Sequence, residues 1–241
     1  MRGLLLVARR DLQAYFNTAW GYVILAAMLL IDGLLFNAFA MGASAQYSSD
    51  VLEKFFYLSS GITMAGAVIL TMRLFGEERS AGTMVLLDTA PLTDLQIVLG
   101  KFLAGFAMIA ILLGLTLYMP ALIFVNGKVS LLHIASGYLG LLALGATVTA
   151  IGTWGSAVTR GQYVGAGITA VVTVALLLTW MLAKVSDPPL KAILSYVALF
   201  DKHFQPFQKG RINIESLVYY ASLTFAFLVL AVRGIQGRRW R

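Results

Sequence analysis

The sequence predicts an all-α integral membrane protein with six membrane-spanning helices. Apolar residues make up 59% of the chain and charged residues only 12%. Soluble domains carry about 25% charged residues, so a water-soluble fold could not bury this much apolar surface. The apolar residues also gather into segments long enough to cross a bilayer. We therefore expect residues 1–241 to form a single membrane domain, with lipid as the solvent for most of it.

Each expected span holds about 20 residues, the length that a helix needs to cross the hydrocarbon core. Helices are expected because lipid offers no partner for open backbone groups. The six segments are Trp20–Met41, Phe55–Phe75, Phe102–Val125, Leu131–Val158, Val164–Ala183 and Leu217–Ile235. Small residues let helices approach closely. Glycines expected to do so are Gly137, Gly140, Gly145, Gly152 and Gly155 in the fourth span, and Gly165 and Gly167 in the fifth.

The distribution of basic residues predicts that both termini face the cytoplasm. With the N-terminus inside, the inner segments hold eleven of the 18 Lys and Arg residues and the outer segments hold seven. Five of those seven lie in one long outer loop, residues 184–216, where charge has less influence on topology. The net charge of +7 is thus explained by topology, and no nucleic-acid partner is expected. The apolar run Leu4–Ala8 is too short for a cleavable signal peptide.

Residues 1–18 are predicted to form an amphipathic helix that lies in the membrane surface and bends into the first span near residues 17–21. At about 100° per residue, an apolar arc faces a polar one. The apolar arc holds Leu4, Leu5, Ala8, Leu12, Tyr15 and Phe16, and the polar arc holds Arg2, Arg9, Arg10, Gln13 and Asn17. Leu6 violates this pattern and Asp11 lies at its edge. A frayed tail is the alternative interpretation.

The inner loop between the second and third spans, residues 76–100, divides into two parts. Residues 77–88 are predicted to form a short helix, polar at its start and apolar later. Pro91 ends it, because proline has no backbone N–H and restrains the residue before it. Thr93 or Asp94 then caps a new helix that enters the third span. Such a helical turn could transmit force from a soluble partner; an ordinary connecting loop is the equal alternative.

This loop resembles the signature region of type-2 ABC exporter permeases, where Glu-Glu-Arg/Lys-x-x-Gly-Thr precedes a Leu-Leu-x-x-x-Pro turn and a Gly-Lys pair. The matching residues are Glu77, Glu78, Arg79, Gly82, Thr83, Leu86, Leu87, Pro91, Gly100 and Lys101. The order of the surrounding segments agrees with that family along the whole chain. The outer segment from His203 to Tyr220 is most similar to the gliding-motility-type (GldF-like) branch and its NosY-like relatives.

The resemblance implies the type-2 ABC exporter (type V) fold, in the cytoplasmic membrane of a bacterium or archaeon. It implies a permease subunit that pairs with a second permease copy and with two ATPase subunits, through a cytoplasmic coupling helix in residues 76–100 that carries the matched residues. ATP and Mg would bind the partner ATPase. This chain lacks a phosphate-binding loop, since Leu95 stands where such a loop before Lys101 needs glycine and Phe102 where it needs Ser or Thr. We expect no cofactor on the chain and no hydrolysis by it.

Three further polar residues, Asp32, Asn37 and Arg73, are candidates for intramembrane roles. A carboxylate in mid-span costs about 2.5–3.5 kcal/mol to insert, so Asp32 should face a cavity, another subunit or a cation, or be protonated. Asn37 would be its weaker neighbour. Arg73 could pair with a carboxylate across a dimer or with a lipid phosphate. No metal site is expected, because the chain has no cysteine and its two histidines, His133 and His203, stand alone.

Two other functions stay open from the sequence. The same fold could serve as a mechanotransmitter that passes ATPase work to an extracytoplasmic partner in gliding or envelope machinery. A secondary transporter or channel is disfavoured, because a proton relay needs several ionisable residues within the membrane and Asp32 is a single one. The sequence does not indicate the transported substrate.

Overall fold

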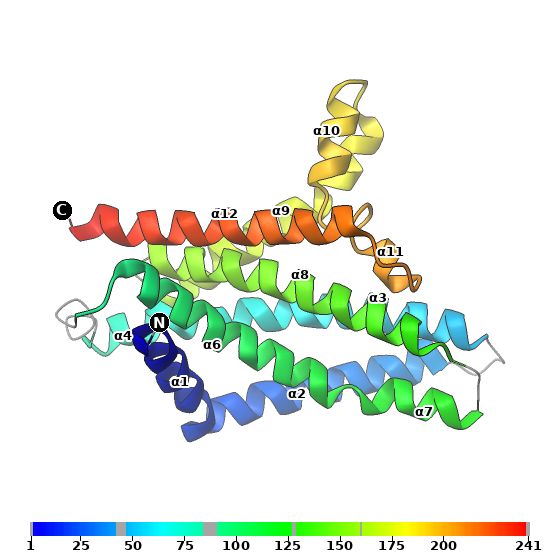
Figure 1. The fold of residues 1–241 in the computed structure, drawn as a ribbon, viewed down its shortest axis with the longest axis horizontal. Helices are drawn as coiled ribbons and strands as arrows, with labels where there is room; N and C mark the ends of the chain where they lie inside the picture. The colour runs from blue at the N-terminus through cyan, green and yellow to red at the C-terminus, as the bar shows by residue number, and fades with distance from the viewer. Residues whose placement is uncertain (1, 42–46, 84–90, 127–128, 160, 240–241) are drawn as a thin grey trace.

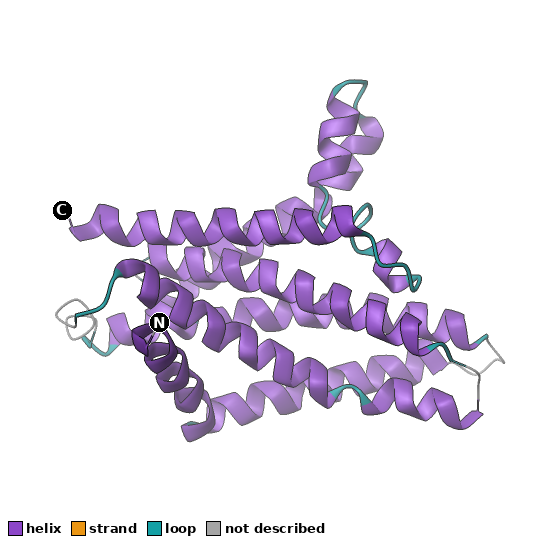
Figure 2. Cartoon of the chain, in the orientation of Figure 1, coloured by secondary structure: helices purple, strands orange, loops and turns teal. Residues whose placement is uncertain are grey.

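The computed structural model describes residues 2–41, 47–83, 91–126, 129–159 and 161–239, and within these residues it contains helices and no strands (Figure 2). The helices in chain order are α1 (Arg2–Asn17), α2 (Ala19–Leu35), the π-helical η1 (Phe36–Met41), α3 (Ser48–Thr71), α4 (Arg73–Ser80), α6 (Asp94–Leu115), α7 (Tyr118–Asn126), α8 (Leu131–Val158), α9 (Gln162–Val185), α10 (Leu190–Val197), α11 (Gln205–Gln208) and α12 (Ile214–Arg239).

Six helical stretches among the described residues are long and apolar enough to cross a membrane. They are Ala19–Ala40, Ser48–Ser80, Asp94–Ile123, Leu131–Val158, Gln162–Val185 and Ile214–Gly237. Each coincides with or overlaps one of the spans predicted from sequence. The prediction of an all-helical chain with six such helices is therefore confirmed, and it indicates a multi-pass membrane protein.

The long helices lie side by side, and the first residues of α1 and the last residues of α12 lie toward the same end of the bundle (Figure 1). We call this the α1 end. There α1 runs obliquely across the long helices, beside α4 and the start of α6. η1 and α7 lie toward the opposite end, and α10 projects away from the bundle.

Glycines let α8 approach its neighbours closely. A Cβ atom on Gly152 would lie 1.9 Å from Oγ1 of Thr71 in α3, so only glycine fits between the two helices. Four other glycines of α8 are similarly crowded by neighbouring side chains: Gly137, Gly140, Gly145 and Gly155. In α9, Gly165 is crowded as expected, but a Cβ on Gly167 would meet nothing within 4 Å. The packing role predicted for Gly167 is wrong, because this residue lies on an exposed face.

Aromatic side chains fasten the segment between α9 and α12 to the bundle. Tyr219 donates a hydrogen bond to the carbonyl of Val197 at 2.6 Å, and Tyr220 donates one to the carbonyl of Leu199 at 2.8 Å. The ring of His203 stacks on Tyr219 with 3.8 Å between centroids and is fully buried. Burial lowers the pKa of His203, so the ring is neutral at neutral pH. Residues 197–204 of the predicted outer loop are therefore packed against the start of α12, whereas α10 has no buried residue.

Replacing Gly152 by Ala should lower the unfolding free energy by about 1–3 kcal/mol, because the added methyl group must push α3 and α8 apart. The matched Gly167→Ala change should be nearly neutral. Thermal unfolding of both variants in detergent tests this, and equal melting temperatures for the two would show that the α3–α8 contact is looser than described.

Candidate functional site

At the α1 end, α1 packs directly against α6 because a glycine lies where the two helices meet. A Cβ atom on Gly100 would lie 2.7 Å from Cβ of Val7 and 3.0 Å from the carbonyl oxygen of Leu4. After Asn17 the backbone of Thr18 is extended (φ −110°, ψ 142°), and the chain turns into α2. The predicted N-terminal helix and its bend are confirmed.

The face that α1 turns inward follows the predicted apolar arc except at Leu5. Tyr15 is 5% exposed and donates a hydrogen bond to the carbonyl of Leu70 at 2.6 Å, whereas Leu5 is 63% exposed. Asp11 also faces the bundle, where it meets a cation of α6. The predicted polar residues Arg9, Arg10, Gln13 and Asn17 are exposed. Polar partners on the neighbouring helices thus add to apolar periodicity in orienting α1.

The helix α4 ends in a Schellman motif formed by the Gly-Thr pair of the signature. Gly82 has a left-handed backbone (φ 70°) and donates to the carbonyl of Arg79 at 3.2 Å. Thr83 donates from its backbone N–H to the carbonyl of Glu78 at 2.9 Å. The helix predicted over residues 77–88 therefore ends at Ser80, since a left-handed residue cannot continue it. Leu86 and Leu87 lie outside the described residues.

On the far side of the turn, Thr93 begins α6 with a capping box. Its Oγ1 accepts from the backbone N–H of Gln96 at 3.3 Å, and the Gln96 side chain accepts from the Thr93 N–H at 3.2 Å. Of the two predicted caps, Thr93 is the one used and Asp94 is the first helical residue. Pro91 lies exposed in the bend just before it.

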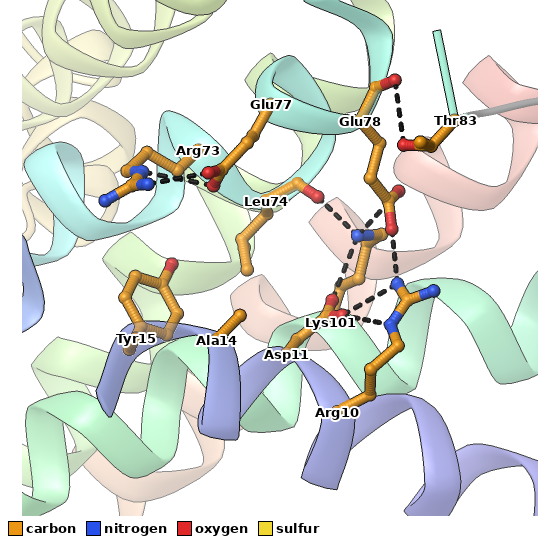
Figure 3. A pocket seen from close by; sticks show the side chains of 10 residues that line it. All are labelled: Arg10, Asp11, Ala14, Tyr15, Arg73, Leu74, Glu77, Glu78, Thr83 and Lys101. Carbon is orange, nitrogen blue, oxygen red and sulfur yellow. Dashed lines mark hydrogen bonds and ion pairs between the residues drawn. The ribbon is translucent and has the colours of Figure 1, made fainter. Parts of the chain in front are cut away.

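A buried lysine joins three helices at this end (Figure 3). Lys101 of α6 is 1% exposed, and its Nζ lies 2.9 Å from Oδ2 of Asp11 in α1 and 2.9 Å from Oε2 of Glu78 in α4. It also donates a hydrogen bond to the carbonyl of Leu74. An ammonium this deeply buried needs such partners, because an uncompensated charge away from water costs several kcal/mol.

Arg10 closes the network on its exposed side by pairing with both Asp11 and Glu78. Burial alone lowers the pKa of Arg10, but the hydrogen bonds and charges of these two carboxylates raise it above its ordinary value. Beside the network lies a cavity of about 350 Å³. Its lining also includes Arg73, which pairs with Glu77 at 2.7 Å rather than standing alone.

The third residue of the Glu-Glu-Arg element fixes α4 to α8. Arg79 donates to the carbonyls of Ser156 at 3.1 Å and Ala157 at 2.7 Å, in the last turn of α8. Those carbonyls have no partner within their own helix and carry its negative dipole end, so a guanidinium suits them. The Ser156 hydroxyl in turn accepts from the backbone N–H of Phe75, where α4 begins.

The structure therefore joins Glu78 and Lys101 in one ion pair, beside Gly100 at the contact of α6 with α1, whereas Gly82 and Thr83 contact α4 itself and end that helix. Glu77 points to the more exposed side and Arg79 to α8. Sequence analysis missed Arg10, Asp11 and Tyr15 as members of the site. The sequence contained one signal for this site. Asp11 is the acidic residue of an otherwise basic N-terminal helix, and Lys101 just before the third span needs a carboxylate partner if it is buried.

Of the three intramembrane candidates, Arg73 lines the cavity at the α1 end and the other two lie elsewhere. Asp32 is 3% exposed in α2 and accepts a hydrogen bond from Ser59 of α3 at 2.9 Å. Asn37 is on the exposed face of η1, so the two residues do not form one polar patch. Asp32 does not line the cavity at the α1 end.

Comparison of the chain with models of known protein families gives no match, and comparison with curated proteins gives none either.

Replacing Lys101 by Met should lower the unfolding free energy by about 3–5 kcal/mol, because it leaves the partly buried Asp11 and Glu78 facing each other without their cation. The matched control is Lys202→Met, which removes an exposed pair with Glu215 (3.1 Å) and should cost less than about 1 kcal/mol. Thermal unfolding in detergent compares the two. An equal loss in both variants would mean that the network is no more than a surface ion pair.

Proposed function

We propose that this chain is the membrane-spanning permease subunit of an ATP-driven ABC exporter of the type-2 class. It works as a dimer of permease copies in the cytoplasmic membrane, with its termini in the cytoplasm. A separate ATPase binds ATP and Mg and drives it through residues 76–100. This places the α1 end of the bundle at the cytoplasmic face.

One observation carries the proposal. The residues that resemble the exporter signature are spread over 25 positions of sequence, from Glu77 to Lys101. Glu78 and Lys101 nevertheless form an ion pair at the junction of α1, α4 and α6, where Gly100 lets α6 pack against α1. There Glu78 and Lys101 link α4 and α6 to α1 through Arg10 and Asp11, and Gly82 and Thr83 end α4. Such an arrangement suits a turn that receives force from a soluble partner and passes it to several spans at once.

The geometry also supports a mechanical role for α4. Its carboxylate Glu78 is bound to α6, and its guanidinium Arg79 is bound to the end of α8. A Cβ atom on Gly76 would lie 2.9 Å from Cα of Gln162, so α4 also touches the start of α9. Movement of α4 must therefore be shared with the helices around it.

A second candidate function is favoured by α10, which lies between α9 and α12 in the chain. This helix projects from the bundle (Figure 1) and exposes apolar side chains, with Leu190 60% and Ile193 58% exposed. In the mechanotransmitter version, an extracytoplasmic or envelope partner, such as gliding machinery, binds there and receives the ATPase work instead of a solute.

Affinity purification of the tagged chain from its native membranes tests the proposal. We expect a protein with an ATPase phosphate-binding loop to co-purify in stoichiometric amount. An extracytoplasmic protein beside it would favour the mechanotransmitter. Recovery of the chain without an ATPase would contradict both versions and favour a channel or secondary carrier.

A matched pair of substitutions locates the ATPase contact. Ala81→Arg places a large charged side chain on the exposed turn that ends α4, and it should abolish or strongly reduce recovery of the ATPase. Ala192→Arg makes the same change on exposed α10 and should leave recovery unchanged. Equal recovery with both variants would place the ATPase contact elsewhere.

A further inference from the structure

Asp32 is a buried acid that has no part in the ion network of the α1 end. It lies in α2, well inside the candidate span Ala19–Ala40, and is 3% exposed. Its carboxyl group faces α3, where the Ser59 hydroxyl lies 2.9 Å from Oδ1 and 3.2 Å from Oδ2. One hydroxyl is thus shared between both carboxyl oxygens.

No cation compensates this carboxyl group. Among the described residues, no Lys, Arg or His nitrogen lies within the 4.0 Å of an ion pair with Asp32. α8 brings Tyr138 into the neighbourhood of Asp32, and α7 brings the Tyr118 hydroxyl near the adjacent Gly33. The titratable groups facing Asp32 from these helices are therefore phenols, which are neutral at physiological pH.

Ionisation at this position is strongly opposed. An isolated carboxylate away from water, with a single hydrogen bond and no cation, is costly enough that such groups bind a proton instead. A protonated carboxyl group needs fewer partners, and it can donate a hydrogen bond of its own. The surroundings of Asp32 match the neutral form.

The backbone beside Asp32 is unusual as well. The Phe36 N–H donates to the carbonyls of both Asp32 and Gly33, and the π-helical η1 begins at this point. Single π-helical turns occur frequently at functional sites. The wide turn starts one helical turn after the buried acid.

We propose that Asp32 and Ser59 form a proton-binding site between α2 and α3. The carboxyl group holds its proton while the two helices are packed as in this structure, and releases it when they separate enough to admit water. Alkaline conditions thus weaken the contact between α2 and α3. The site is independent of the exporter assignment, because it rests on residues away from the coupling region.

Infrared spectroscopy of the full chain in lipid nanodiscs at neutral pH tests the protonation state. We expect the C=O stretching band of a protonated carboxyl group, lost in Asp32→Asn. Ser59→Ala should shift this band to higher wavenumber, because it removes a hydrogen bond to the carboxyl group. The shift assigns the band even if Asp32→Asn does not fold. A spectrum in which neither substitution changes a protonated carboxyl band would overturn the proposal.

The pH dependence of thermal unfolding provides a second readout. Below about pH 4, where aspartic acid is protonated in the folded and the unfolded chain alike, Asp32→Asn should melt within about 2 °C of the unsubstituted chain, since an amide resembles the neutral acid. As the pH rises, the unsubstituted chain should lose stability relative to Asp32→Asn, because ionisation of the buried acid is penalised only in the folded state. Asp50→Asn, at an exposed carboxylate in the first turn of α3, should show no such divergence. Parallel pH profiles for Asp32→Asn and the unsubstituted chain would overturn the proposal.

Discussion

The ammonium group of Lys101 is the point on which the α1 end of this protein depends. It is buried within a helix bundle, so its charge must be matched by groups fixed in position. The matching groups come from separate elements: Asp11 from α1, and Glu78 together with the carbonyl of Leu74 from α4. Satisfying one lysine therefore sets the positions of two other helices relative to α6.

The neighbouring residues make this arrangement possible. Gly100 allows the backbone of α1 to reach α6 closely enough for Asp11 to meet Lys101. Gly82 ends α4 immediately after the side chains that bind α6 and α8. The signature thus contains two kinds of residue. Charged residues bind neighbouring helices together, and glycines either let two helices pack closely or allow the left-handed backbone that ends a helix. In the proposed exporter, this assembly is the part that the ATPase would move.

Much of the architecture was predictable from sequence, because lipid imposes a strong rule on segment length and polarity. The six spans follow from hydropathy alone, and Thr93 was one of two expected caps. Periodicity was wrong at Leu5, which is exposed. It left Asp11 at the edge of the apolar arc, because it cannot identify a buried lysine partner about 90 positions away. The length of α4 was also overestimated, because Gly82 was not recognised as a left-handed helix end. The partner of Asp32, Ser59, lies on another span, so only the packing of α2 on α3 identifies it.

The central claim is that the Lys101 network holds α1 and α4 in one fixed arrangement. The chain contains no cysteine, so spin labels can be attached at Arg9→Cys in α1 and Ser80→Cys at the end of α4, both exposed positions. Pulsed electron paramagnetic resonance then measures the distribution of distances between them in nanodiscs. We expect a narrow distribution in the chain with Lys101 and a clearly broader one after Lys101→Met. Identical distributions in the two proteins would contradict the claim, because α1 and α4 would then be held in place without the lysine.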